Sequence, residues 1–158
     1  MTKAKSAKKE RIGQIVLKQW SGSDFPLHCN YQVIPKGHKY SPHTHDGVEL
    51  VFITKGSGIE YIGGVTYPII TGDLFVIDVG STHAFTVESN LEFYNLIFQP
   101  ELFSKDEMSE LASIPHFHSF FLPKKRATQA KLGILPAVQE RINTLFSRLT
   151  RELAARRP

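Results

Sequence analysis

A succession of short β-type segments dominates the sequence between Ile12 and Gln99. Each segment is rich in Val, Ile, Phe, Tyr and Thr, and is separated from the next by Gly, Pro, Asn or Asp. The pair Gly63-Gly64 predicts a two-residue hairpin, because both positions can adopt a positive φ. Closely spaced strands with no long helix among them favour an all-β antiparallel sandwich or barrel. The expected strands are 13–20, 28–35, 47–54, 58–62, 65–70, 73–78, 82–88 and 91–98.

The pattern changes after Pro100 and becomes partly helical. One or two helical turns are expected at 106–113, and 117–122 is a further strand candidate. Pro136 suits the first turn of a helix. From there, apolar residues at spacings of three, four and seven predict one amphipathic helix over 136–156. Its apolar face consists of Val138, Ile142, Leu145, Phe146, Leu149 and Leu153. The pattern leaves open whether this face packs on the barrel or on a second subunit.

The charge is distributed unevenly along the chain. Residues 30–110 hold four Lys and eleven carboxylates, whereas residues 1–29 and 111–158 are both basic. A nucleic-acid-binding domain normally carries its positive charge on the folded body, so this acidic body is not expected to bind DNA by itself. The tail at 1–11, with five basic residues, is interpreted as a flexible solvated terminus. Contact with DNA phosphates is the alternative.

Several features predict a soluble intracellular protein. No stretch approaches about 18 uninterrupted apolar residues, so no membrane span is expected. The basic first residues are not followed by the apolar segment of a secretory signal. Cys29 is the only cysteine, which agrees with a reducing compartment. We therefore expect a cytoplasmic location.

The segment from Gly37 to Gly56 carries the clearest chemical signal. It reads G-x5-H-x-H-x3-E-x6-G, with His43, His45 and Glu49 as the polar positions. Residues of equal parity on a strand share one face, so these side chains can converge. His83, near the end of a second segment at 72–85, can reach the same point from a neighbouring strand. Imidazoles and a carboxylate are ligands of divalent transition metals.

This spacing resembles the first motif of the cupin superfamily, and it matches that motif at every position. The second cupin motif, G-x5-P-x-G-x2-H-x3-N, is matched at Gly72, Gly80 and His83. It departs at Asp78, where the family has Pro, and at Val87, where the family has Asn. The resemblance covers about residues 30–99. It implies a cupin fold, which is a jelly-roll barrel or double-stranded β-helix, with a pocket inside.

A narrower resemblance involves the order of the segments. A cupin, then NLIFQPELF, FHSFFL and a helix ending in RELAARRP looks like the N-terminal sensing half of AraC-type transcription regulators. The resemblance implies a cupin sensing domain at 12–122 that binds a small-molecule effector. It also implies a linker and dimerisation helix at 123–158, which would form a homodimer. A separate C-terminal half with two helix-turn-helix units binds DNA in that family. We find no such pattern here, so DNA contact is expected only through a half that is absent from this chain.

Residues on the ligand-bearing strands are expected to form the effector pocket. Val51, Ile53, Phe85 and Val87 would give it apolar walls, if strand register holds without a bulge. Such walls suit a small, partly polar molecule, and sugars, aromatic acids and metabolite amides are not separable. The metal set is His43, His45, Glu49 and His83, for Zn, Ni, Fe or Mn. The sequence leaves open whether a metal is bound.

The alternative to a regulator domain is a free-standing metal-dependent cupin enzyme, such as a dioxygenase or an isomerase. The complete ligand set favours an enzyme, but no additional acid–base pair can be placed, so no catalytic residue is assigned. The amphipathic helix and the RELAARRP ending favour the regulator. A second His-x-His pair at His116 and His118 is interpreted as strand or loop residues, because no acidic partner has suitable spacing.

Overall fold

Two long, bent strands organise the fold. β4 (Val48–Ile62) and β7 (His83–Phe98) pair antiparallel along most of their lengths. Their register shifts at several points between Ile53 and Gly58, and such bulges bend a strand. The two halves of each strand therefore pair with different neighbouring strands. The structure, a computed structural model, describes residues 12–22, 24–114 and 130–155.

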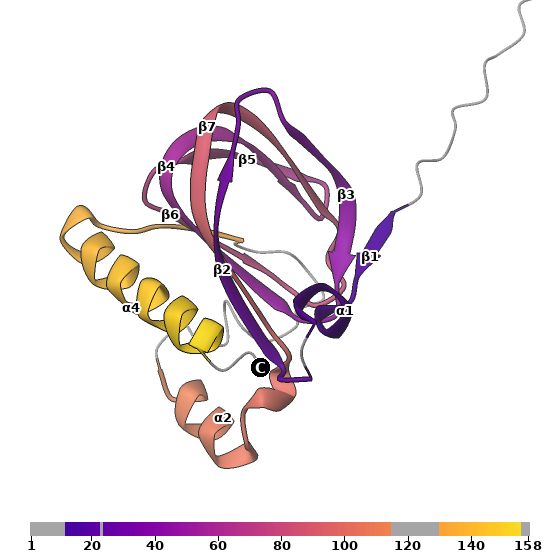
Figure 1. Ribbon diagram of the computed structural model, residues 1–158, viewed down its shortest axis with the longest axis vertical. Coiled ribbons are helices and arrows are strands. Elements are labelled where there is room, and N and C mark those ends of the chain that lie inside the picture. The colour runs from indigo at the N-terminus through magenta and orange to yellow at the C-terminus, as the bar shows by residue number, and fades with distance from the viewer. Residues whose placement is uncertain (1–11, 23, 115–129, 156–158) are drawn as a thin grey trace, which may run out of the picture.

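The remaining strands flank these two halves and form a jelly-roll barrel of the cupin type (Figure 1). β2 pairs with the second half of β7, and β6 pairs with the first half of β4. β3 pairs with the first half of β7, and β5 pairs with the second half of β4. β1 lies parallel to β3, and β8 pairs with β6 at the edge of the sheet. The bounds are β1 Gly13–Ile15, β2 Leu27–Ile34, β3 Lys39–His45, β5 Val65–Ile70, β6 Asp73–Ile77 and β8 Lys131–Gly133.

The bulged middle of β4 changes which residues face the interior. Before it, Glu49, Val51 and Ile53 are buried, and after it Glu60 and Ile62 are buried. The inward positions thus change from odd to even numbers, as expected when an extra residue is inserted into a strand. The result is a continuous apolar core that joins β4 to its neighbours. That core contains Val51, Ile53, Ile62, Ile69, Phe75, Ile77, Val87, Leu91, Phe93 and Ala130.

A glycine within this bulge is required by close packing. Gly56 has a φ of +100°, and a Cβ placed on it would lie 2.2 Å from the carbonyl oxygen of Asn90. Only glycine fits there without a shift of the backbone. The glycine that closes the first sequence motif is therefore explained by the bend of β4 and its approach to β7.

The expected strands are confirmed in part. The hairpin at Gly63-Gly64 has the positive φ values predicted, 55° and 87°, and the strand at 65–70 has the bounds expected. In two places a single long strand replaces two expected ones. β4 replaces those at 47–54 and 58–62, and β7 replaces those at 82–88 and 91–98, because the chain bends through bulges instead of turning back. β3 and β8 were not among the strands expected.

The expectation of a strand at 13–20 was wrong. β1 ends at Ile15, and helix α1 (Leu17–Ser21) follows. The backbone N–H of Leu17 donates to Asp46 Oδ1 at 2.8 Å, which satisfies a donor at the start of the helix. Gly22 then ends the helix in the left-handed conformation, with a φ of 66°. A long-range contact with Asp46 thus redirects the chain.

In the described part of the chain after β7, the helices α2 and α4 lie close to the expected places. α2 (Lys105–Ala112) begins with a capping box between Ser104 and Glu107, after the short 3-10 helix η1 (Pro100–Leu102). α4 (Pro136–Ala155) starts at the proline as predicted. None of the helices in the described segments is long and apolar enough to cross a membrane. The tail at 1–11, the strand candidate at 117–122, and His116 and His118 lie outside the described residues.

Helix α4 lies against the outer face of the sheet beside β2 (Figure 1). The Phe146 ring stacks on both Phe52 and Tyr94, with centroids 5.9 Å and 5.4 Å away. Val138 and Leu145 of the same apolar stripe are 42% and 59% exposed. The stripe is therefore divided between the barrel and the surface.

The short strand β8 attaches the start of α4 to the barrel. Lys131 Nζ lies 2.8 Å from Asp73 Oδ2 and donates to the carbonyl oxygen of Pro68 at 2.7 Å. The N–H of Ile134 also donates to the carbonyl oxygen of Gly72 at 2.9 Å. These contacts hold the N-terminal end of α4 next to β6.

Candidate metal centre and ligand cavity

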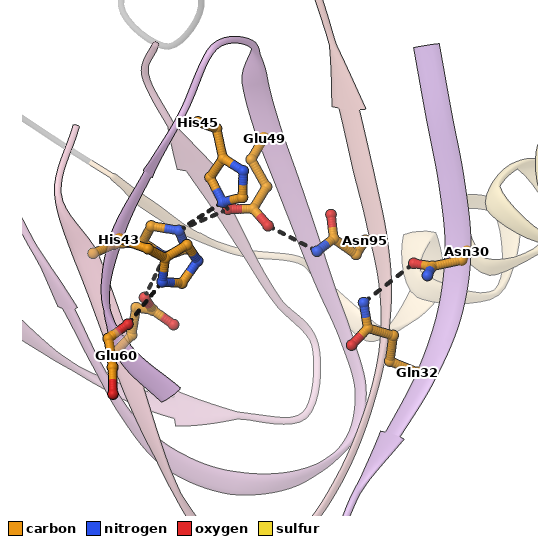
Figure 2. A network of polar contacts seen from close by, with 9 residues as sticks. Asn30, Gln32, His43, His45, Glu49, Glu60 and Asn95 are labelled. Carbon is orange, nitrogen blue, oxygen red and sulfur yellow. Dashed lines mark hydrogen bonds and ion pairs between the residues drawn. The ribbon is translucent and has the colours of Figure 1, made fainter. Parts of the chain in front are cut away.

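Three histidines and a glutamate meet at one end of the barrel interior. β3 carries His43 and His45, and β7 begins at His83, which pairs directly with His43. Glu49 lies at the second position of β4, after a short turn. All four side chains are buried, with exposed fractions between 2% and 8%. Strand register thus brings together the four residues that the motifs indicate, and Figure 2 shows His43, His45 and Glu49 among them.

The donor atoms of this cluster are close enough to share one ion. The Nε2 atoms of His45 and His83 lie 2.9 Å apart, and Glu49 Oε2 lies 3.3 Å and 3.2 Å from them. One ring nitrogen from each of the three histidines lies within 4.8 Å of the other two. Two atoms bound at about 2.1 Å to one metal are about 3.0–3.4 Å apart in octahedral or tetrahedral geometry. The shorter separations in the cluster are near this range.

Two histidine rings are oriented from behind by oxygen atoms. His43 Nδ1 lies 2.8 Å from the carbonyl oxygen of Ser41. His83 Nδ1 lies 3.1 Å from Glu60 Oε1. When each Nδ1–H donates to its oxygen, the lone pair on Nε2 faces the cluster. This arrangement is typical of histidines that bind metals.

The carboxylate of Glu49 accepts a well-formed hydrogen bond at one of its two oxygens only, among the described residues. Its Oε1 accepts a hydrogen bond from Asn95 Nδ2 at 2.8 Å (Figure 2). Its Oε2 has no hydrogen bond of good geometry among the described residues, and His45 Nδ1 has none either. A buried carboxylate oxygen without a donor is costly. A cation between Glu49 and the histidines would remove that cost.

The electrostatics favour the protonation states that bind metals. Burial holds the pKa of His43 and of His83 below the usual value for imidazole, which favours neutral rings. Burial opposes ionisation of Glu49, but the contacts with His45, His83 and Asn95 outweigh it, so the pKa of Glu49 is lowered. Neutral imidazole and ionised carboxylate are the metal-binding forms. The donor set therefore fits a divalent transition metal, which when bound would act as a Lewis acid.

A cavity lies beside the histidine cluster. Val51, Ile53 and Phe85 line it, as the alternation along the strands predicts. Val87 does not belong to the lining of this cavity. It is 4% exposed and packs in the apolar core. Like Phe85 and Phe93 it is an odd-numbered residue of β7 and faces the interior, but other core residues cover it.

Polar residues of the cavity were missed by sequence reasoning. They are Gln32, Tyr40, Glu60 and Asn95. Alternation along β4 from Glu49 places Glu60 on the opposite face, but the bulge brings it inside. The Gly-Ser-Gly at 56–58 was the available signal, because glycines inside a strand mark bulges. Burial and the nearby charge of Glu49 raise the pKa of Glu60 well above its usual value.

The fold and the site together define a ligand-binding domain of the cupin type. Residues 26–157 match the family of AraC-like ligand binding domains. The chain belongs to this family, and it is a sensing domain of an AraC-type regulator.

Two relatives illustrate the similarity. The chain is 32% identical over 80 residues to the HTH-type transcriptional activator RhaR of Escherichia coli (strain K12), which is 51% of this chain and 28% of that protein. It is 35% identical over 78 residues to the activator of the same name from Salmonella arizonae, covering 49% and 27% of the two chains. The chain thus spans less than a third of these relatives.

Similarities to solved structures are weaker. A conserved protein of unknown function from Streptococcus pyogenes has a TM-score of 0.47 and 22% identity, covering 49% of this chain and 68% of that one. Salicylate 1,2-dioxygenase from Pseudoaminobacter salicylatoxidans has a TM-score of 0.45 and 18% identity, covering 46% of this chain and 21% of that one.

Proposed function

We propose that this domain binds a small-molecule effector in the cavity beside the histidine cluster. The cavity combines apolar walls with a few polar groups, an arrangement common in ligand sites. Its walls include Phe85 and Phe93, and its polar groups include Gln32 and Asn95. Bound effector would alter the barrel to which α4 is attached. The family membership and this buried polar cavity carry the proposal.

We further propose that a divalent transition metal, such as Zn, Ni, Fe or Mn, binds at His43, His45, Glu49 and His83. The short distances from Glu49 Oε2 to two histidine nitrogens, and the lack of a hydrogen-bond donor to this oxygen among the described residues, support this role. In a regulator, the metal would hold an oxygen atom of the effector instead of activating it for reaction.

Helix α4 is proposed to form the homodimer. Val138 and Leu145 are exposed on its apolar stripe. Next to α4, an apolar groove lies between the helices and the sheet. It is lined by Leu27, Leu50, Leu96, Phe98, Leu102, Phe103, Leu111 and Leu149. A second copy related by a two-fold axis would cover both the stripe and the groove.

We propose that DNA is bound by a separate helix-turn-helix half of the whole protein, in the cytoplasm. The names of the relatives describe them as HTH-type activators, and the matched region is only part of their length. The excess of carboxylates over residues 30–110 argues against specific DNA binding by the barrel. A mobility-shift assay at physiological salt with specific and scrambled promoter DNA would check this, and a sequence preference of the isolated chain would contradict it.

A metal cupin enzyme is the second candidate function. The three histidines and Glu49 favour it, because a non-haem metal with open positions can bind substrate and oxygen. Oxygen uptake by the iron-loaded protein with candidate aromatic substrates would support the enzyme.

The effector proposal is best tested in the whole regulator, encoded by the full reading frame. Transcription from the adjacent promoter should respond to an effector in the wild-type protein. We expect His83→Ala and Phe93→Ala to lose this response, because they alter the metal centre and the cavity wall. Tyr61→Ala is a matched control on the outer face of β4, where Tyr61 is 40% exposed. An unchanged response in both cavity variants would contradict effector binding at this site.

A further inference from the structure

Glu60 is a second buried acid beside the metal centre, outside both sequence motifs. Its side chain is 3% exposed, and its Oε1 lies 3.1 Å from His83 Nδ1. Within the described part of the chain, His83 is the only basic side chain at ion-pair distance from Glu60. The carboxyl group is therefore directed at one edge of one metal-binding ring.

We propose that Glu60 is a positioning residue for the metal centre. Its Oε1 accepts a hydrogen bond from His83 Nδ1–H, and this bond holds the Nε2 lone pair towards His45 and Glu49. Such an outer acceptor sets both the tautomer and the orientation of a metal-binding histidine. The role depends on the proposed metal centre, because it has no consequence for binding unless His83 is a ligand.

The position of the His83 ring shows why an acceptor is needed on its far side. His83 Nε2 lies 3.2 Å from Glu49 Oε2. Without Glu60, His83 can place its proton on Nε2 and donate it to Glu49, which leaves Nδ1 as the unprotonated nitrogen. In that tautomer no lone pair on Nε2 faces the other ligands. Glu60 opposes this state by accepting a proton donor at Nδ1.

The fold itself gains little from Glu60. A buried carboxyl group without a full cationic partner is costly to desolvate. Tyr67 and Phe85 face Glu60 across the ladder on its two sides, so an apolar side chain of similar size has apolar neighbours. We therefore expect Glu60→Leu to preserve the thermal stability of the metal-free protein while weakening metal binding. A purely structural residue would show a loss of stability.

The test is a calorimetric titration of the metal-free chain with Zn²⁺ at one fixed pH. Glu60→Leu removes the acceptor, and we expect the affinity to fall 10–100-fold. Glu60→Gln keeps an acceptor oxygen, and its affinity should stay within a few-fold of wild type. Glu92→Leu removes one carboxylate from the outside of β7, where Glu92 pairs with Lys55. This variant controls for the non-specific electrostatic attraction of Zn²⁺ to the acidic barrel, and its Zn²⁺ affinity should equal that of the wild type.

Two further measurements separate positioning from folding. In the Zn²⁺-loaded wild type, ¹⁵N NMR should show a His83 Nδ1 proton that is shifted downfield and protected from exchange, and this signal should be lost in Glu60→Leu. Melting temperatures of the metal-free proteins should be alike.

Three outcomes would overturn the role of Glu60. Equal Zn²⁺ affinity of Glu60→Leu and wild type would exclude Glu60 alone and leave the metal centre intact. A Glu60→Gln variant as weak as Glu60→Leu would exclude the acceptor role. Absence of Zn²⁺ binding by the wild type would instead remove the proposed metal centre, and the role of Glu60 with it.

Discussion

His45 and His83 are separated by 38 positions in the sequence, yet their Nε2 atoms lie 2.9 Å apart in the barrel. Two imidazole nitrogens at this distance need a proton or a cation between them, because two lone pairs repel. The antiparallel pairing of β3 with β7 creates this contact by placing His83 opposite His43.

We expect the chain, purified without an affinity tag, to contain one divalent transition metal per molecule. In the metal-loaded protein the ligand atoms should lie about 2.0–2.2 Å from a common centre. The double variant His43→Ala/His45→Ala should lose the metal, since two of four donors are removed. Elemental analysis measures this. Native protein without metal, or equal metal in the double variant, would contradict the prediction.

Adding metal should also stabilise the native state, because only the folded barrel assembles the site. At a free metal concentration 100 times the dissociation constant, the expected gain in unfolding free energy is about 2.7 kcal/mol. Urea unfolding with and without Zn²⁺ measures this gain. The variant His43→Ala/His45→Ala serves as the control and should show little change.

Gly56→Ala should strongly destabilise the barrel. The φ of +100° and the 2.2 Å approach of the new Cβ to the Asn90 carbonyl oxygen both oppose alanine. Backbone strain of about 1–3 kcal/mol adds to the steric clash, so we expect a total loss of roughly 3 kcal/mol or more in the free energy of unfolding. Gly64→Ala is the matched control, since its φ is +87° with open space around the Cβ, and we expect a loss of about 1–2 kcal/mol. Equal losses would show that the close approach has no effect.

Phe146→Ala should detach helix α4 from the barrel. Its ring stacks on Phe52 and Tyr94. Because Phe146 is only half-buried, we expect a loss of about 2 kcal/mol, less than the 3–5 kcal/mol typical of a fully buried Phe. Leu145→Ala, one position away and exposed, should change stability by about 0.5 kcal/mol or less. Urea unfolding measures the loss of stability, and hydrogen exchange of the α4 amides measures detachment of the helix. Unchanged exchange of the α4 amides in Phe146→Ala would contradict the packing role.

Dimerisation through α4 is tested by replacing the exposed part of its stripe. Val138→Asp with Leu145→Asp removes apolar groups that are exposed in one chain, whereas Leu149 lines the groove and also affects the fold. Burial of a large apolar side chain contributes roughly 1.5–3 kcal/mol, so the double variant should dissociate at least about 100-fold more readily. Light scattering across a dilution series measures this.

Asn143→Asp is the control for the dimer test, because it adds a charge on the opposite, exposed side of α4. It should dimerise like the wild type. A wild-type chain that is monomeric at high concentration would exclude dimerisation by this chain. A double variant that is folded and fully dimeric would exclude the exposed stripe of α4 as the dimer interface.

Local patterns in the sequence predicted much of the fold. Alternating apolar residues, the Gly63-Gly64 pair and the helical spacing after Pro136 all depend on neighbours within a few positions. The spacing of His43, His45 and Glu49 has the same local character, because side-chain direction along a regular strand follows from residue number. His83 was expected to reach the same point from a neighbouring strand, and the second cupin motif also contains it.

Only the tertiary structure decided the rest. Alternation fails wherever a strand bulges, so the burial of Glu60 depends on how β4 bends against β7 at Gly56. Val87 faces the interior as alternation predicts, but the packing of the core keeps it out of the cavity lining. The helix at Leu17 depends on Asp46, and the division of the α4 stripe depends on where Phe52 and Tyr94 lie on the sheet. Each of these features depends on contacts between residues far apart in the chain, which the alternation of residues along a single strand does not predict.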